Sequence, residues 1–146
     1  MNSLNYKKNI ALCLGLFIML FQSCISDKLP NINHLKGYWK IDFITEQGEI
    51  FKPKSSALLF DHYSIFKKQG ELNKVSSAIG YKFETSLDAN SFTIVTRKKY
   101  YFLKFKTPWD EWSKKISYLD SHKLIIENDK RTFHYKRPVF IKFENE

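Results

Sequence analysis

The chain is poor in the residues that mark several classes of protein. Its 146 residues include five glycines, four prolines and two cysteines. So little glycine and proline excludes collagen-like and low-complexity chains, and the 16% of aromatic residues argues against disorder. Both cysteines lie within the first 24 residues, so the rest of the chain offers no cysteine for a metal site. The length suits one modest domain, and no internal repeat is present.

Long apolar runs are scarce as well. The longest, Ile10–Phe21, has twelve residues. That length is too short to span a bilayer but suits the apolar part of an export signal. Lys7 and Lys8 before it supply the positive charge with which such signals begin. We therefore expect residues 1–23 to be an export signal that is not part of the fold.

The end of this segment, Leu20-Phe21-Gln22-Ser23-Cys24, resembles a bacterial lipoprotein lipobox of the short Ser-Cys form found in the Bacteroidota. The usual box has Leu three residues before the Cys, where this chain has Phe21. The resemblance implies cleavage before Cys24, acylation of Cys24 and an outer-membrane lipoprotein. Residues 24–34 would then be an acylated tether and residues 35–146 the domain. Cleavage by ordinary signal peptidase, giving a secreted protein, is the alternative.

Basic residues outnumber acidic ones throughout the chain. The formal net charge is +9, and removing residues 1–23 takes away two lysines and no acid, which leaves +7. Such a charge is compatible with a nearby anionic lipid or glycan. An exported protein rarely meets nucleic acid, so we do not expect a nucleic-acid partner.

From Leu35 onward the apolar residues recur with a period of two, which indicates strands. Gly37, Trp39, Ile41 and Phe43 share one predicted face. Eight to ten short strands favour an all-β fold, a single small antiparallel up-and-down β-barrel, with a sandwich as the related possibility. Thr107 followed by Pro and an early acid predicts one short helical turn over residues 107–110.

The first of these strands resembles the Gly-x-Trp opening strand of lipocalins, here Gly37-Tyr38-Trp39. The resemblance, over residues 35 to about 138, is to the short lipocalin-like domains of Bacteroidota lipoproteins. In that family the Trp plugs one end of the barrel, and an Arg of the last strand packs across its ring. Arg137 is the candidate, because it shares its parity with Phe133 and Tyr135. Gly37, Trp39 and Arg137 would then close the barrel and have a structural role.

Motifs of catalysis are missing. The four histidines are scattered, with no His-Glu-x-x-His motif, so we expect no metal. No Gly-rich phosphate loop and no Gly-x-Ser-x-Gly elbow occur, so we expect neither an enzyme nor a cofactor. Asp61 with His62 and Asp120 with His122 are possible acid–base pairs, but both are predicted in or beside turns, where Asp is common anyway.

Two aromatic groups are candidates for contact with a ligand or partner. Tyr100 lies in a basic and aromatic stretch, residues 97–102, which is either a solvated strand start or a patch for anionic headgroups or glycans. Trp109 and Trp112 are three residues apart and form either core beneath a loop or an aromatic lip at the barrel mouth. Many inward aromatic rings predict at most a small apolar pocket near these two Trp residues.

Two functions remain open after this reading. The first is a non-enzymatic module, anchored in the membrane, that binds a small apolar or amphipathic molecule. The second is a protein-interaction, inhibitor or immunity lipoprotein that meets an envelope protein through its outer surface.

Overall fold

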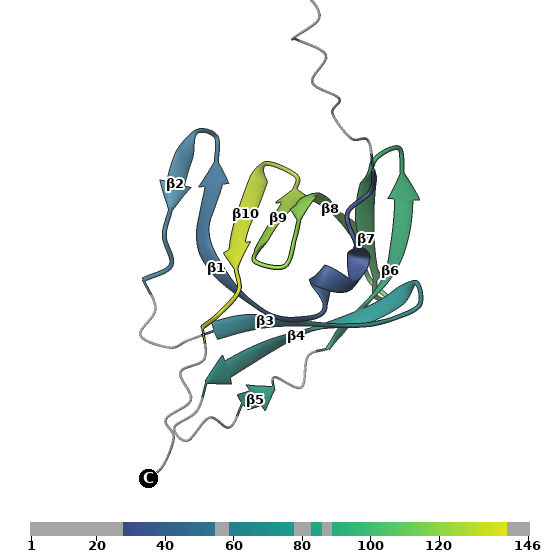
Figure 1. The fold of residues 1–146 in the computed structure, drawn as a ribbon, viewed down its shortest axis with the longest axis horizontal. Coiled ribbons are helices and arrows are strands. Elements are labelled where there is room, and N and C mark those ends of the chain that lie inside the picture. The colour runs from purple at the N-terminus through teal and green to yellow at the C-terminus, as the bar shows by residue number, and fades with distance from the viewer. Residues whose placement is uncertain (1–27, 55–58, 78–82, 86–88, 140–146) are drawn as a thin grey trace, which may run out of the picture.

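A computed structural model describes residues 28–54, 59–77, 83–85 and 89–139 (Figure 1). One 3-10 helix, η1 (Ile32–Leu35), precedes the strands. The strands are β1 (Gly37–Glu46), β2 (Glu49–Phe51), β3 (Leu59–Phe66), β4 (Gln69–Ser77), β5 (Phe83–Thr85), β6 (Asn90–Arg97), β7 (Tyr100–Lys106), β8 (Glu111–Leu119), β9 (Lys123–Asn128) and β10 (Arg131–Lys136).

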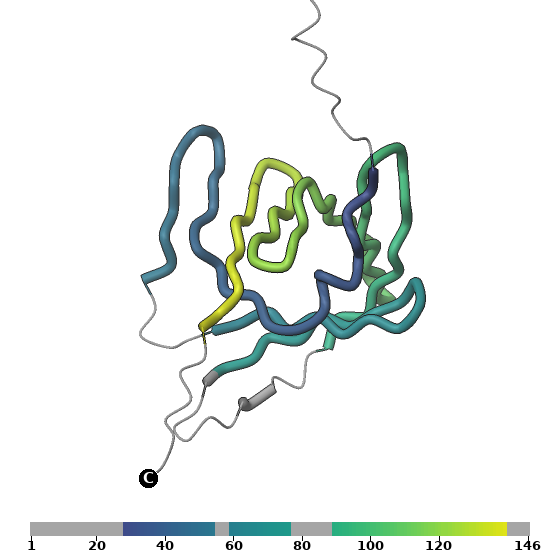
Figure 2. The backbone as a smooth tube through the Cα atoms, viewed as in Figure 1, coloured from purple at the N-terminus to yellow at the C-terminus, as the bar shows by residue number. Residues whose placement is uncertain are grey.

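The strands form one antiparallel barrel. Neighbours follow the order β1, β3, β4, β6, β7, β8, β9, β10, and β10 pairs back with β1, which closes a ring of eight strands. β2 pairs with the far half of β1, and β5 pairs with the end of β4. Figure 2 shows the chain curling round until β10 lies beside β1. The all-β, up-and-down barrel predicted from the sequence is confirmed.

Because each ring strand runs antiparallel to the next, the connections alternate between two ends of the barrel. We call one the η1 end: it holds η1, the β3–β4, β6–β7 and β8–β9 turns and the end of β10. The other is the Trp109 end, with the β1–β2, β7–β8 and β9–β10 turns. In Figure 1 the β3–β4 and β6–β7 turns lie on the right and the β1–β2 hairpin on the left.

The core fills the barrel between these ends. Alternate residues of each strand point inward, as the pleat requires. The largest fully buried side chains are Trp39, Tyr63, Phe105, Leu35, Leu103, Leu124 and Ile126, with Val75 buried on the other face of β4. The predicted inward positions Tyr101, Phe105, Phe133 and Tyr135 all belong to the core or pack against it. Tyr81 and the side chain of Phe83, also predicted inward, lie outside the described residues.

The prediction that Phe43 shares the inner face of Trp39 is wrong. The pairing of β1 with β10 shifts by one residue between Ile41 and Phe43, which is a β-bulge at Asp42. A bulge reverses the facing of every residue that follows it. Phe43 therefore lies on the outer face, where its ring stacks on His134 with centroids 4.1 Å apart.

The prediction of a helical turn over residues 107–110 is also wrong, because these residues are not helical. Thr107 uses its hydroxyl oxygen to accept the N–H groups of Trp109, at 3.3 Å, and Asp110, at 3.0 Å, which closes a tight turn between β7 and β8. The helical piece is η1, capped by the side chain of Asn31. Its Leu35 is buried, and the carbonyl of Leu35 accepts the Trp39 indole N–H at 2.8 Å.

Candidate functional site at the Trp109 end of the barrel

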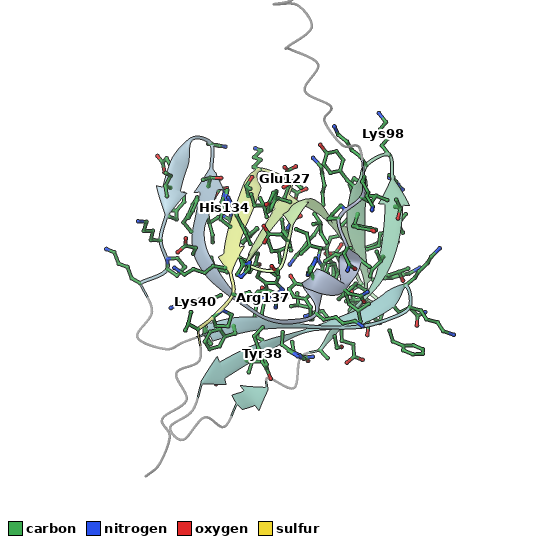
Figure 3. All side chains as sticks on the ribbon, in the orientation of Figure 1. Tyr38, Lys40, Lys98, Glu127, His134 and Arg137 are labelled. Carbon is green, nitrogen blue, oxygen red and sulfur yellow. The ribbon has the colours of Figure 1, made fainter. Side chains whose placement is uncertain are left out.

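The η1 end is closed by Arg137. Its guanidinium lies 3.7 Å from the centroid of the Trp39 ring, so the structure brings together the two residues that the lipocalin resemblance pairs. Arg137 is labelled in Figure 3. Arg137 donates to the Tyr38 carbonyl at 3.0 Å, the Ser121 carbonyl at 3.1 Å and the carbonyl of His34. One side chain therefore ties η1, β1 and the β8–β9 turn together.

Gly37 makes room for this closure. Its φ of +97° lies in a region that other residues rarely adopt, and a Cβ there would meet an Arg137 nitrogen at 3.2 Å. The three residues predicted to close the barrel thus lie in one contact. This end leaves no inner surface for a ligand, because Trp39 and Leu35 are completely buried behind Arg137.

The Trp109 end is more open. Inward-facing residues become more exposed toward this end along several strands. On β1, for example, Trp39 is buried and Ile41 is partly exposed. The same change occurs from Leu72 to Lys74 on β4, from Tyr135 to Phe133 on β10 and from Ile116 to Trp112 on β8. Exposed apolar side chains surround this end. They are Ile50, Phe51, Leu59 and Trp109. The Trp109 end of the barrel therefore has an apolar rim.

Below this rim lies a buried carboxylate. Asp61 on β3 is 3% exposed, and it points inward beside its cross-strand partner Lys74 on β4. The Lys74 ammonium forms an ion pair with one Asp61 oxygen, and the Tyr135 hydroxyl donates to the other at 2.9 Å. Lys74 itself is 56% exposed, so its charge reaches the opening. Asp61 is the one buried charged residue among those the structure describes.

A second lysine faces the same interior. Lys114 on β8 is the cross-strand partner of the fully buried Leu103, which fixes its inward direction. Its ammonium lies 5.3 Å from the centroid of the Phe105 ring. Burial lowers the pKa of Lys114, while the charge of Asp61 raises it and that of Lys74 lowers it further. Within the described part of the chain, Lys114 has no carboxylate at ion-pair distance.

The tyrosines of this cluster are held neutral. Burial raises the pKa of Tyr63 and of Tyr135 well above the usual value, with Asp61 adding to the effect. The Tyr63 hydroxyl is buried and makes no hydrogen bond of normal geometry with any described residue. Two lysines and one aspartate give the cluster a net charge of +1 when all are ionised. An anionic group with acceptor oxygens matches this arrangement.

The three predicted contact residues do not meet at one place. Trp109 is 94% exposed in the β7–β8 turn, whereas Trp112 points inward and stacks on Phe105, with centroids 5.2 Å apart and planes at 2°. Tyr100 lies at the η1 end of β7, where the Lys115 ammonium is 4.2 Å from its ring centroid.

Sequence reasoning missed the cluster that Asp61, Lys74 and Lys114 form. The inward parity of Lys114 with Trp112 and Ile116 was the available signal.

The predicted acid–base pairs are not pairs. Asp61 and His62 are successive residues of a strand, so their side chains point to opposite faces. Asp120 accepts the backbone N–H groups of His122 and Lys123, each at 2.7 Å, and thereby caps the β8–β9 turn. The Tyr118 hydroxyl also donates to Asp120, and this bond has the largest effect on the pKa of Asp120. Together with the two backbone bonds it lowers that pKa to about 2.

A separate groove lies on the outer wall. It has a volume of about 510 Å³ and runs across β3, β4, β6 and β7, and its lining includes neither Trp109 nor Trp112. Its lining includes the outward-facing Ser64, Glu71, Thr93 and Lys104. Over the described residues, no group of three His, Cys, Asp or Glu side chains is placed to hold a metal ion. Nor does that part of the chain contain a helix long and apolar enough to cross a membrane.

Comparison with known proteins gives a match among solved structures. It is a crystal structure of a lipocalin-like protein from Bacteroides uniformis ATCC 8492, 12% identical, with a TM-score of 0.46. The match covers 71% of this chain and 98% of that one. No protein-family model and no curated protein matches the chain.

Proposed function

We propose that this protein is a lipocalin-like binding module that takes a small amphipathic molecule into the Trp109 end of its barrel. The observation that carries the proposal is the inward-facing polar cluster of Asp61, Lys74 and Lys114 inside an otherwise apolar barrel. Burying charged groups costs free energy, and a ligand that pairs with the excess cation would offset part of that cost.

The inward-facing side chains determine which head group and which chain length the ligand has. The acidic group of the ligand would lie between Lys74 and Lys114, with the Tyr63 hydroxyl as a further donor. Its apolar part would contact Trp112, Phe133 and the rim residues. The η1 half of the barrel is filled by Trp39, Leu103 and other core side chains, so we expect a short apolar chain rather than a long one.

Titration of short amphiphiles tests this proposal. The probes are decanoate, decanol and decylamine, which share a chain and differ in head group, and the readouts are calorimetry and tryptophan fluorescence. Decanoate should bind saturably to the processed chain. Lys114→Met should weaken its binding by about tenfold or more, since a charged hydrogen bond contributes on the order of 1.5–3 kcal/mol.

Lys115→Met is the matched control. Lys115 is the next residue of β8, faces outward and pairs with Glu127 on the surface at 2.9 Å, so its loss should leave binding unchanged. If none of the probes binds saturably, the interior is closed core and the proposal is wrong.

We further propose that the protein is an outer-membrane lipoprotein anchored through Cys24. The lipobox-like sequence before Cys24 supports this. Metabolic labelling with a fatty acid should mark the wild-type chain and not Cys24→Ala, and an unlabelled wild-type chain would refute the anchor.

The second candidate function, interaction with an envelope protein, is favoured by the open groove on the outer wall. Capture of a defined partner that is lost in Thr93→Arg would support it.

A further inference from the structure

Charge is unevenly distributed between the two ends of the barrel. The turns of the η1 end, the residues flanking them and the residue after η1 carry seven exposed cations and one acid, Asp120. These cations are Lys36, Lys67, Lys68, Arg97, Lys98, Lys99 and Lys123. We call this set the basic end surface. In the described turns of the Trp109 end and the residues flanking them, acids outnumber cations. The acids are Glu46, Glu49, Asp110, Glu111 and Asp129, and the cations are Lys106, Lys130 and Arg131.

An exposed apolar side chain lies beside the basic end surface, where it also lines the outer-wall groove. Phe66 lies at the end of β3, directly before the β3–β4 turn, and is 76% exposed. The Lys67 ammonium lies 5.3 Å from the centroid of its ring, and Lys68 follows. An exposed aromatic ring flanked by lysines is suited to a lipid interface, where the ring enters the headgroup region and the ammonium groups stay at the phosphates.

The N-terminal part of the chain reaches the barrel at this same end. The first described residue is Lys28, and it leads within four residues into η1. Lys98, labelled in Figure 3, lies at the turn of the β6–β7 hairpin, which belongs to the same end. Cys24 lies four residues before Lys28 in the sequence, which is at most about 14 Å of extended chain. A lipid on Cys24 would therefore hold the basic end surface close to the bilayer.

We propose that the basic end surface is a docking surface for an anionic lipid leaflet, with Phe66 entering the headgroup layer. The barrel then stands on its closed end, and the Trp109 end faces away from the membrane. This orientation leaves the opening free for a ligand that arrives from the aqueous side. The docking surface is independent of the ligand proposal, because it depends on the turns of the opposite end.

Vesicle binding of the chain without its lipid tests the surface. All the strand pairings of the barrel lie within residues 37–136, so a chain that starts at residue 25 keeps the whole barrel. This chain should bind vesicles that contain phosphatidylglycerol, bind phosphatidylcholine vesicles far less, and lose binding as salt is raised. Reversing Lys68 and Lys98 together, as Lys68→Glu with Lys98→Glu, should lower partitioning on the order of 30-fold or more.

The control reverses the same charge at the other end. Lys106→Glu with Lys130→Glu gives an identical net charge, and both residues are exposed and belong to the Trp109 end. It should change partitioning only a few-fold. Phe66→Ser should weaken binding without changing its dependence on salt. Equal losses in the two double variants would show that net charge alone drives binding, and would overturn the proposal, as would failure of the unlipidated chain to bind anionic vesicles.

A second measurement does not depend on charge reversal. Since residues 25–146 contain no cysteine, a single cysteine can be introduced into the lipidated protein and labelled with a fluorophore. Lys68→Cys should place the label where lipids with brominated chains quench it, whereas Lys130→Cys should leave the label unquenched. Equal quenching at the two sites, or stronger quenching at residue 130, would mean that the barrel does not stand on its η1 end.

Discussion

Removal of the Arg137 side chain should destabilise the barrel more than one cation–π contact would suggest. From the sequence alone, a single contact with Trp39 predicts a cost of about 1–2 kcal/mol. The structure adds hydrogen bonds to the carbonyls of His34 and Tyr38, which are partly buried, and a more exposed bond to Ser121. Two charged hydrogen bonds at about 1.5 kcal/mol each and the ring contact at about 1 kcal/mol give about 4 kcal/mol for Arg137→Ala.

Urea unfolding followed by circular dichroism measures this cost. Arg131→Ala is the matched control, because Arg131 begins β10, which Arg137 directly follows, but Arg131 forms an exposed pair with Glu46 at 2.8 Å. Such surface pairs contribute less than about 1 kcal/mol. A double-mutant cycle of Arg137→Ala with Trp39→Leu should show a coupling of about 1 kcal/mol. The reasoning fails if Arg137→Ala costs no more than Arg131→Ala, or if the cycle shows no coupling.

Further variants test individual contacts. Trp39→Ala should cost about 3–5 kcal/mol in unfolding free energy, as for a large aromatic side chain removed from a core. Gly70→Ala should cost about 2 kcal/mol or more in the same assay, because its Cβ would lie 2.4 Å from the Ser64 carbonyl and from the Phe92 ring. Gly48→Ala has nothing within 4 Å, so its cost should be only the backbone strain of its φ of +88°, about 1 kcal/mol. Asp120 has a pKa of about 2 when folded and 3.8 as its ordinary value, so its contribution is present above about pH 4 and is lost as pH falls toward 2. Asp120→Asn should remove that part of the acid sensitivity of the urea midpoint, and an unchanged pH profile would refute the capping role.

The barrel was predictable because most strands alternate clearly. In β10, Phe133 and Tyr135 alternate with polar residues, and Arg137 after the strand continues their parity. The structure keeps this alternation. β4 lacks such an alternation, and the turn before it is Lys67-Lys68. The inward positions of β4 are Gly70, Leu72 and Lys74, so the strand lacks an apolar row. Gly70 is needed there because the Phe92 ring occupies the space of a side chain.

The errors in β1 and in the β7–β8 turn have local causes that a periodic pattern does not reveal. A bulge at Asp42 inserts one residue and reverses the facing of Phe43, and nothing in the residue types marks it. Thr107 followed by Pro suits both a helix start and a tight turn. The turn forms because the Thr107 hydroxyl binds the Asp110 N–H and carbonyl across the hairpin.

The polar cluster was hidden from the sequence because a strand lysine is normally assigned to the solvent face. Lys114 and Lys115 are adjacent, and pairing with the buried Leu103 on β7 establishes that Lys114 is the inward one. Likewise, Asp61 and Lys74 are thirteen residues apart and meet only through the register of β3 with β4. Long-range register, rather than composition, creates this site.

The two ends of the barrel have complementary physical roles. At the η1 end, Arg137 satisfies three carbonyls and covers Trp39, so its charge is used inside the structure and the end is closed. At the Trp109 end, the charge of Lys114 has no such partner among the described residues, and the inner side chains around it are partly exposed. An ammonium group that is partly buried beside a single shared carboxylate is a costly arrangement for stability alone. That cost is the physical reason to look for the ligand at this end of the barrel and for the membrane at the other.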